Sequence, residues 1–498
     1  MALRSVVFKR TALLSIPLLT LAVTVGLLSA FAHRAWIDRL YDRLLYSVIA
    51  KRVLQGSVSP QMAVDRLTQY VFLNVHGGAG PVADNDDPPA DTLFGGYGYC
   101  DQHVRLFMAL AQQAGLATRE TFLIRQPDGI SPHTVAEVYL GGRWEMVDVF
   151  YDYVAKRHDG SPATMQDVVA TSDPIIGLAG LQPSDYQNAR IQLEWHPNRL
   201  ANWLWGHVPG WLADRAQDLY LRLPPPTLPA ADASGREYGL QSPDGAVYWK
   251  ARNYELFGRA AAAQAEYHRL LSAFPDGAFA DDARYNLSLM ELDGAPAASI
   301  SLASQLDDAD TTPALQQDAR YLLGTAYEHV GGAQACASAL GIFQDLAGAL
   351  VIDSPAALRQ LNHSPCSSGN HAQPLARFGP LTLQAARLDG GGVLLVWQAD
   401  AHMARDYTIF VHALDGSGQV IAQHDSQPAM GALPTSKMRL NEVIADRHPL
   451  VIPRDAEQLE IGAYLLSTGK RLGEPNGQDA LRLPVEVGSA PGEAVAAA

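Results

Sequence analysis

The chain has 498 residues, of which 48 % are hydrophobic and 18 % charged. This is a globular composition, and the length predicts about three or four domains. The formal net charge of −15 and the lack of a sustained basic run exclude broad nucleic-acid binding. Three cysteines are too few for a disulfide scaffold, and none is spaced as C-x-x-C, so we expect neither a metal site nor a cofactor.

The N-terminus carries a targeting signal. Residues 1–10 contain three basic side chains, and residues 11–32 are uncharged. A run of this length approaches the roughly 20 residues that cross a bilayer as a helix. Basic residues before it favour a cytoplasmic N-terminus, so we expect a single-pass anchor in the inner (cytoplasmic) membrane, with most of the chain in the periplasm. A cleaved signal peptide is the alternative, because Ala30-Phe31-Ala32 fits a cleavage site.

Two amphipathic helices are predicted between residues 36 and 74, with a break near Gly56-Ser57. Ser59-Pro60 supplies an N-cap followed by proline at the first helical position. Residues 76–91 are rich in Gly, Pro, Asp and Asn, which predicts a surface loop. The aspartates of this loop lack the glycine and distal glutamate of a calcium-binding loop, so we interpret them as solvated.

Cys100 follows a glycine- and tyrosine-rich approach and precedes a predicted helix. Apolar residues recur at i, i+3, i+4 and i+7 from Val104, and Gly115 marks the end of the helix. Cys100 therefore lies in the first helical turn. Unpaired amides and the positive end of the helix dipole favour the thiolate there, and the same N–H groups could receive an oxyanion.

A β-hairpin is predicted downstream, with Gly141-Gly142 as its turn and strands at 134–140 and 143–150. In this register Asp148 faces Val135, so His133 and Asp148 are diagonal neighbours on one face, roughly 7–8 Å apart at Cα. A carboxylate placed in this way can orient an imidazole whose second nitrogen meets a thiol. Asp152 is an alternative carboxylate.

Three motifs in this order resemble those of the transglutaminase-like, papain-like cysteine superfamily. They are Gly98-Tyr99-Cys100 with its helix, the segment 115–119 (GLATR), and the segment 133–148, which is similar to H-x-W-x-E-v-y-l-x-G-x-W-x-x-v-D. Val135 departs from this pattern, because an aromatic residue is common there, and so does Gln102, where the family often has a basic or small residue. The resemblance implies an α+β papain-like fold across residues 36–223.

The resemblance also implies catalytic roles for three residues: Cys100 as nucleophile, His133 as general base and acid, and Asp148 as orienting carboxylate. The predicted activity is that of a cysteine protease, amidase or acyltransferase on a peptide, protein or polysaccharide-linked substrate, with water or an amine resolving a thioester. The alternative is a transglutaminase-like scaffold without catalysis, which would organise envelope protein or polysaccharide assembly.

Residues 153–250 are predicted to be irregular, with a linker at 224–250 that includes three consecutive prolines. A helical stretch before the linker carries Trp203, Trp205 and Trp211. These side chains either pack against the catalytic domain or form a helix at a membrane interface.

Residues 251–350 are predicted to form helical repeats. The segment 282–285 (DARY) recurs at 318–321, an offset close to the 34-residue period of tetratricopeptide hairpins, which this segment resembles. Such repeats either brace neighbouring domains or bind a protein partner.

Beyond a polar linker, alternating segments separated by Asp-Gly turns predict an antiparallel β-sandwich over residues 376–488. The segment 406–412 and the residues around His424 resemble sandwich modules attached to bacterial envelope glycosyltransferases. Residues 489–498 are expected to be a disordered tail. The predicted fold class is thus multidomain, and whether Cys336 and Cys366 form a disulfide stays open at this stage.

Overall fold

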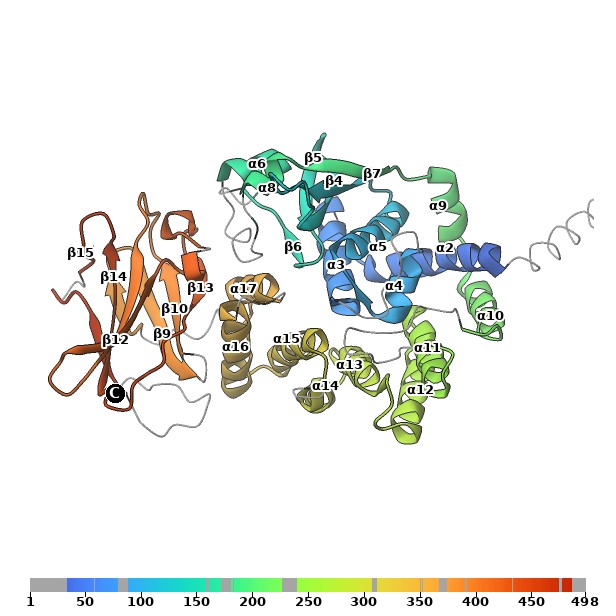
Figure 1. Ribbon diagram of the computed structural model, residues 1–498. Coiled ribbons are helices and arrows are strands. Elements are labelled where there is room, and N and C mark those ends of the chain that lie inside the picture. The colour runs from blue at the N-terminus through green and yellow to red at the C-terminus, as the bar shows by residue number, and fades with distance from the viewer. Residues whose placement is uncertain are drawn as a thin grey trace, which may run out of the picture.

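The computed structural model describes residues 34–57, 59–78, 88–157, 161–171, 181, 183–225, 240–306, 311–349, 351, 353–366, 374–389, 392–431, 433–473 and 477–485 (Figure 1). The predicted anchor at 11–32 and the predicted tail at 489–498 lie outside these residues. Within the described ranges, no helix combines the length and apolar character needed to cross a membrane.

The two predicted N-terminal helices are present as α2 (Arg34–Val53) and α3 (Pro60–Asn74). The Met62 N–H donates to the Ser59 hydroxyl at 3.1 Å, which is the predicted cap. The segment predicted as a loop up to residue 91 is instead helical at its end, because α4 (Pro89–Gly95) begins there with proline in its first turn. A short parallel pair, β1 (His76–Gly77) and β2 (Tyr97–Gly98), then leads into α5 (Cys100–Gln113).

An antiparallel sheet in the order β6-β5-β4-β3-β7 packs against α5. Its strands are β3 (Thr118–Leu123), β4 (His133–Leu140), β5 (Arg143–Asp148), β6 (Tyr153–Val154) and β7 (Arg190–Trp195). β7 corrects the prediction that residues 153–250 are irregular. Its side chains are mostly exposed, but Ile191, Leu193 and Trp195 alternate with polar residues, which is a strand pattern that the prediction overlooked. Among the described residues, this region also contains the helices α6 (Met165–Thr171), α8 (Pro183–Gln187), α9 (Arg199–Gly206) and α10 (Gly210–Tyr220).

Seven helices follow, and they form a curved layer below α3 and α4 in Figure 1. They are α11 (Pro243–Leu256), α12 (Ala260–Ala273), α13 (Ala280–Glu291), α14 (Pro296–Ala303), α15 (Pro313–Val330), α16 (Ala333–Gly348) and α17 (Ser354–His363). Successive helices pack as hairpins, such as α11 with α12 and α15 with α16. The helical layer begins inside the segment predicted as a linker, because Ser242 caps α11 by accepting from the Gly245 N–H.

The repeated Asp-Ala-Arg-Tyr segments lie on α13 and α15, and side chains from both contact the N-terminal region. The Tyr285 hydroxyl donates to the Leu73 carbonyl at 3.0 Å. The Asp318 carboxyl forms a buried hydrogen bond with the His76 ring, and the Tyr321 ring meets the edge of Phe72 at 5.4 Å. These contacts favour the bracing role for this face of the repeats.

The C-terminal region consists of two antiparallel sheets, which confirms that part of the predicted fold class. One has the order β13-β10-β9-β8 and the other β12-β11-β14-β15, with β16 also paired to β14. Their strands are β8 (Ala376–Phe378), β9 (Leu381–Asp389), β10 (Gly392–Ala399), β11 (Thr408–Leu414), β12 (Val420–Ser426), β13 (Val443–His448), β14 (Gln458–Leu465), β15 (Lys470–Arg471) and β16 (Leu481–Pro484). Both sheets share one buried cluster with side chains of α16 and α17.

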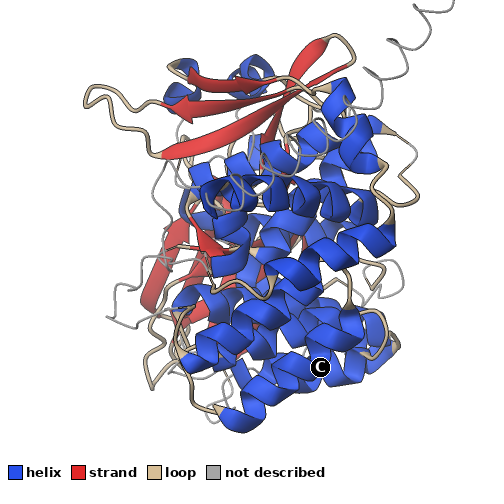
Figure 2. Cartoon of the chain, turned by 90° about the vertical axis from the view of Figure 1, so that its right-hand side faces the viewer, coloured by secondary structure: helices blue, strands red, loops and turns tan. Residues whose placement is uncertain are grey.

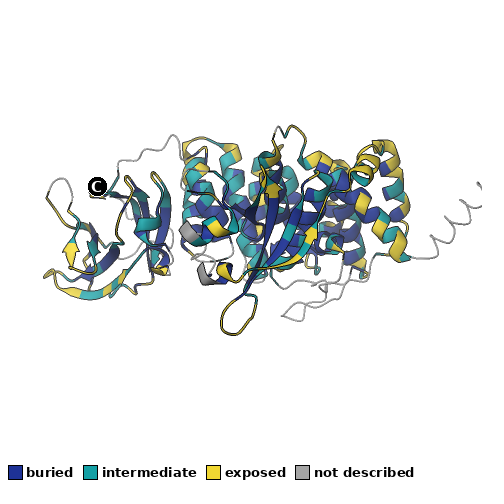
Figure 3. Cartoon of the chain, turned by 90° about the horizontal axis from the view of Figure 1, so that it is seen from above, coloured by how far each residue is buried: buried dark blue, intermediate teal, exposed yellow. Residues whose placement is uncertain are grey.

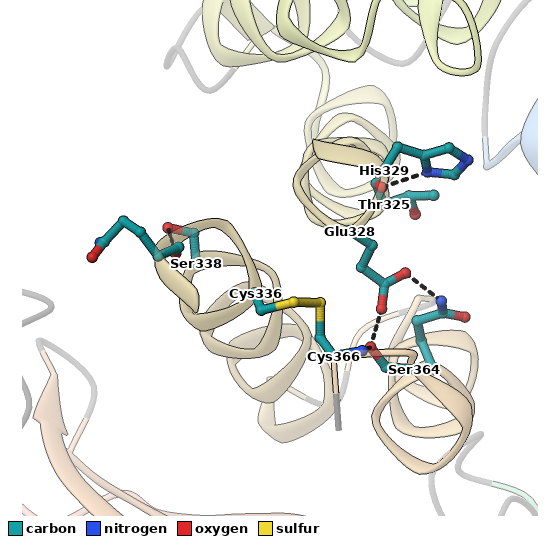
Figure 4. The surroundings of a disulfide bond; sticks show 9 residues. Thr325, Glu328, His329, Cys336, Ser338, Ser364 and Cys366 are labelled. Atoms are coloured by element: carbon teal, nitrogen blue, oxygen red, sulfur yellow. Dashed lines mark hydrogen bonds between the residues drawn. A yellow bond between two sulfur atoms is a disulfide. The ribbon is translucent and has the colours of Figure 1, made fainter. Parts of the chain in front are cut away.

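A disulfide joins Cys336 of α16 to Cys366, just beyond α17 (Figure 4). Beside it, Glu328 accepts hydrogen bonds from Ser364 and from the Gln360 amide. The end of α17 is therefore fixed to α15 and α16 by covalent and polar contacts. Cys100 is the cysteine left free.

Candidate active site

Cys100 is the first residue of α5, as predicted. The preceding Tyr99 is extended, and its N–H donates to the buried side chain of Gln102 at 2.7 Å. The helical bonds begin with the His103 N–H and the Tyr99 carbonyl at 3.0 Å. The amides of Cys100 and the next residue have no acceptor within the helix, because they precede its first bond. The half-buried thiol thus lies beside N–H donors at the positive end of α5.

His103 holds this end of α5 in place. Its ring is buried, and its two nitrogens lie 2.9 Å from the Tyr99 carbonyl oxygen and 3.0 Å from that of Val75. Burial lowers the pKa of His103, although both carbonyl contacts oppose that effect. The neutral ring can donate from one nitrogen only, so it ties α5 to the end of α3 through one conventional bond and one close polar contact.

The hairpin has the predicted register, since Ala136 pairs with Val147 and Leu140 with Arg143. This register puts His133 and Asp148 on one face. His133 Nε2 lies 2.8 Å from Asp148 Oδ2, and both side chains are buried. The other ring nitrogen, Nδ1, therefore remains for Cys100.

The three predicted residues interact electrostatically. Burial by itself lowers the pKa of His133, but the charge of Asp148 and its hydrogen bond, together with a hydrogen bond to Cys100, raise that pKa to about 10. The imidazole is consequently protonated at neutral pH. An imidazolium between a carboxylate and a sulfur can stabilise a thiolate and later deliver a proton.

Two aromatic residues that the sequence motifs did not single out enclose the imidazole. The His133 ring lies 5.1 Å from the Tyr151 ring and 5.8 Å from Phe150, between centroids. Burial, Asp148 and Cys100 each raise the pKa of Tyr151, so its hydroxyl stays protonated. Their only signal in the sequence is that they lie two and three residues after Asp148.

The alternative carboxylate, Asp152, points to a different partner. It is fully buried, has a φ of 49°, and forms an ion pair with Arg359 of α17. Burial raises the pKa of Asp152 to about 6 against the opposing effect of Arg359. The geometry therefore pairs His133 with Asp148 and leaves Asp152 as a contact to the helical layer.

Across the sheet, the Arg119 guanidinium stacks over Trp144 at 3.6 Å and bonds to Glu194 of β7 at 3.1 Å. Glu137 accepts from the Thr121 hydroxyl at 3.0 Å. These motif residues link neighbouring strands of the sheet. Among the described side chains, no group of three His, Cys, Asp or Glu residues converges as a metal site.

Comparison with known families agrees with this geometry. Residues 48–149 match the family model described as the transglutaminase-like superfamily. This part of the chain is therefore similar to a transglutaminase-like domain. The match runs from within α2 to the residue after Asp148, so it includes all three candidate residues. A transglutaminase-like domain suggests a cysteine-type acyl-transfer or hydrolase fold. No curated protein and no solved structure matches the chain.

Proposed function

We propose that this protein is a membrane-anchored, extracytoplasmic cysteine enzyme that performs acyl transfer or amide hydrolysis. Cys100 is the nucleophile, His133 the general acid and base, and Asp148 the carboxylate that orients the imidazole. The observation that carries the proposal is the position of His133, which bonds to Asp148 at 2.8 Å and interacts with Cys100 through its remaining side.

In the proposed reaction the Cys100 thiolate attacks a substrate amide carbonyl, and the carbon–sulfur bond forms as the carbonyl oxygen takes the negative charge. Amides at the start of α5 supply donors for that oxyanion. The His133 imidazolium then protonates the departing amine, which leaves a thioester. Neutral His133 takes a proton from water, or from an acceptor amine, as that nucleophile displaces the sulfur.

Two tyrosines near the nucleophile differ in what they can contribute. Tyr97 is buried, and its ring packs against His76 at 4.9 Å, so it cannot meet a substrate without rearrangement. Tyr99 is 46 % exposed and directly precedes Cys100. We therefore assign Tyr99 to the rim of the substrate site and leave the oxyanion to the backbone.

The proposed location rests on two observations. The uncharged run 11–32 is long enough for an anchor, and the basic residues before it favour export of the remainder. The disulfide between Cys336 and Cys366 is of the kind that persists outside the cytoplasm. Substrates in this location are peptides, proteins or peptide-linked polysaccharides of the cell envelope, and hydrolysis is the reaction we favour.

The alternative is a scaffold without catalysis. It is favoured by the buried clusters that join the N-terminal region, the helical layer and the C-terminal sheets. Burial of His133 and Asp148 leaves Cys100 and Tyr99 as the more accessible groups of the site. The reactivity of the Cys100 thiol distinguishes the enzyme from the scaffold, because a scaffold does not need an activated thiol.

The test is the pH dependence of Cys100 alkylation by iodoacetamide, followed by intact mass. Cys100 is the one free thiol, so the mass change is unambiguous, and Cys100→Ser is the blank. We expect alkylation to persist below about pH 7, where ordinary cysteines are mostly protonated. In His133→Gln the reaction should fall to the level of a free cysteine. A wild-type profile centred near about 8.5 and unaffected by His133→Gln would sink the enzyme proposal.

A further inference from the structure

The end of the molecule that carries α9, α10 and the start of α2 exposes a group of large apolar side chains. These helices lie at one end of the ribbon in Figure 1, and Figure 3 colours much of that end as exposed. We call this group the apolar end patch: Trp36, Leu200, Trp203, Leu204, Trp211, Leu212 and Leu219. The eight tryptophans of the chain are all described, and the exposed ones are the three in this patch. Trp203 is 57 % exposed and Trp211 69 %.

The patch results from how α9 and α10 are docked. Leu200, Trp203 and Leu204 follow the i, i+3, i+4 spacing of one helix face, and α9 has no buried residue. The helix is nevertheless held in place, because the Asn202 amide donates to the Gln112 carbonyl at 2.5 Å. The apolar face of α9 therefore points to solvent, opposite to the arrangement of a surface helix in a soluble protein.

α10 is fixed by its inner face in the same way. Tyr220 is buried and stacks on Tyr41 of α2, with ring centroids 3.6 Å apart. The Tyr220 hydroxyl donates to Asp38 at 2.9 Å, and Arg34 bonds to the Pro224 carbonyl at the same distance. The start of α2 is thus tied to the end of α10.

These contacts put the patch next to the point where the N-terminal segment joins the folded body. The uncharged run 11–32 ends two residues before Arg34, the first residue of α2. If that run is inserted in a bilayer, the start of α2 lies at the membrane surface, and so do α9 and α10. Figure 2 looks onto this side of the molecule.

Charge at this end suits a lipid surface. Exposed arginines surround the patch: Arg39, Arg199, Arg215 and Arg222. Asp38 is paired with Arg34 and Asp218 with Arg259, which leaves Asp214 as the exposed carboxylate of α10. A basic rim around tryptophan and leucine is typical of helices that lie in the headgroup region, and it contrasts with the net charge of −15 of the whole chain.

We propose that the apolar end patch inserts into the headgroup region of the bilayer that holds the N-terminal anchor. The inference rests on the membrane location proposed above and adds a second contact, which fixes the orientation of the catalytic domain. Gln112, near the end of α5, bonds to the loop before α9, whereas Cys100 begins that helix. At 1.5 Å per residue, α5 holds the thiol about 20 Å from its membrane-side end.

Site-directed spin labelling of the full chain tests this orientation. In a Cys100→Ser background, Leu204→Cys provides one labelling site, and Leu466→Cys, on the turn after β14, is the matched control because Leu466 is also exposed, at 69 %. The protein is placed in nanodiscs of phosphatidylethanolamine and phosphatidylglycerol. We expect the label at 204 to be several-fold less accessible than that at 466 to a water-soluble nickel relaxant, and more accessible to oxygen.

Two outcomes would overturn the proposal. Equal nickel accessibility at 204 and 466 would mean that the patch stays in water. Protection at 204 that disappears when each nanodisc holds one chain would identify a second copy as the occupant. Flotation of the full chain with vesicles of the same lipids tests the anchor separately, and Cys100 alkylation of the wild type tests the proposed function separately.

Discussion

At the residue scale, His133 determines what the site can do, because Asp148 and Cys100 hold its imidazole in the charged form. Its pKa of about 10 lies above the value of about 6.5 for an unfolded chain. A raised folded-state pKa means that protonation stabilises the fold. The contribution is fully present below about pH 6.5 and is lost as the pH rises toward 10.

We therefore predict that the free energy of unfolding falls between pH 6.5 and 10, by a few kcal/mol if each pKa unit is worth about 1.4 kcal/mol. Urea unfolding at both pH values measures the change. His133→Gln removes the titrating ring and should flatten the curve over this range. An equally steep decline in that variant would assign the effect to another group.

At the element scale, the loop after β5 links the site to the helical layer. Tyr151 packs on His133, and the next residue, Asp152, is buried in the left-handed region and paired with Arg359 of α17. Asp tolerates positive φ better than most residues, and the ion pair compensates its buried charge. Asp152 and Arg359 are 207 residues apart in sequence. The position of Tyr151, the neighbour of Asp152, thus depends on a helix that is distant in the chain.

We predict that Arg359→Ala destabilises the protein by about 3–5 kcal/mol, because it strands a buried carboxylate. Asp152→Asn should keep the backbone geometry and remove the charge, so the double variant should lose less than the sum of the single losses. Urea unfolding of the four proteins gives the coupling energy. Additive losses would show that the pair contributes nothing beyond packing.

The same loop shows where sequence reasoning succeeds and where it stops. The α5 helix, the Gly141-Gly142 turn and the hairpin register follow from local periodicity and turn chemistry, whereas the choice of Cys100, His133 and Asp148 as candidates also needed the family resemblance. Tyr151 and the Asp152–Arg359 pair depend on tertiary contacts, and nothing in their local pattern signals them. The edge strand β7 does have the alternation of a strand, which the prediction overlooked, and α4 lies in a segment rich in loop-forming residues.

At the scale of the whole molecule, the transglutaminase-like domain, the helical layer and the C-terminal sheets share buried hydrophobic clusters. One buried cluster joins the transglutaminase-like domain to α11, α12 and α13, and a second joins α16 and α17 to both C-terminal sheets. Phe72 of α3 belongs to this second cluster, so the transglutaminase-like domain contacts both. Changes in the helical layer can therefore reach the site.

The disulfide provides a test of that coupling. It closes a loop of 30 residues, and its loss in Cys336→Ser/Cys366→Ser should cost about 3 kcal/mol. Loss of the disulfide releases the end of α17 from α16. The same helix contains Arg359, the partner of Asp152. Hydrogen exchange should therefore accelerate in α17 and in the loop 149–154, while α11 and α12, which lie in the other buried cluster, serve as the unchanged reference. Faster exchange confined to residues near 336 and 366 would show that α17 holds its place without the bond and that the site is insulated from it.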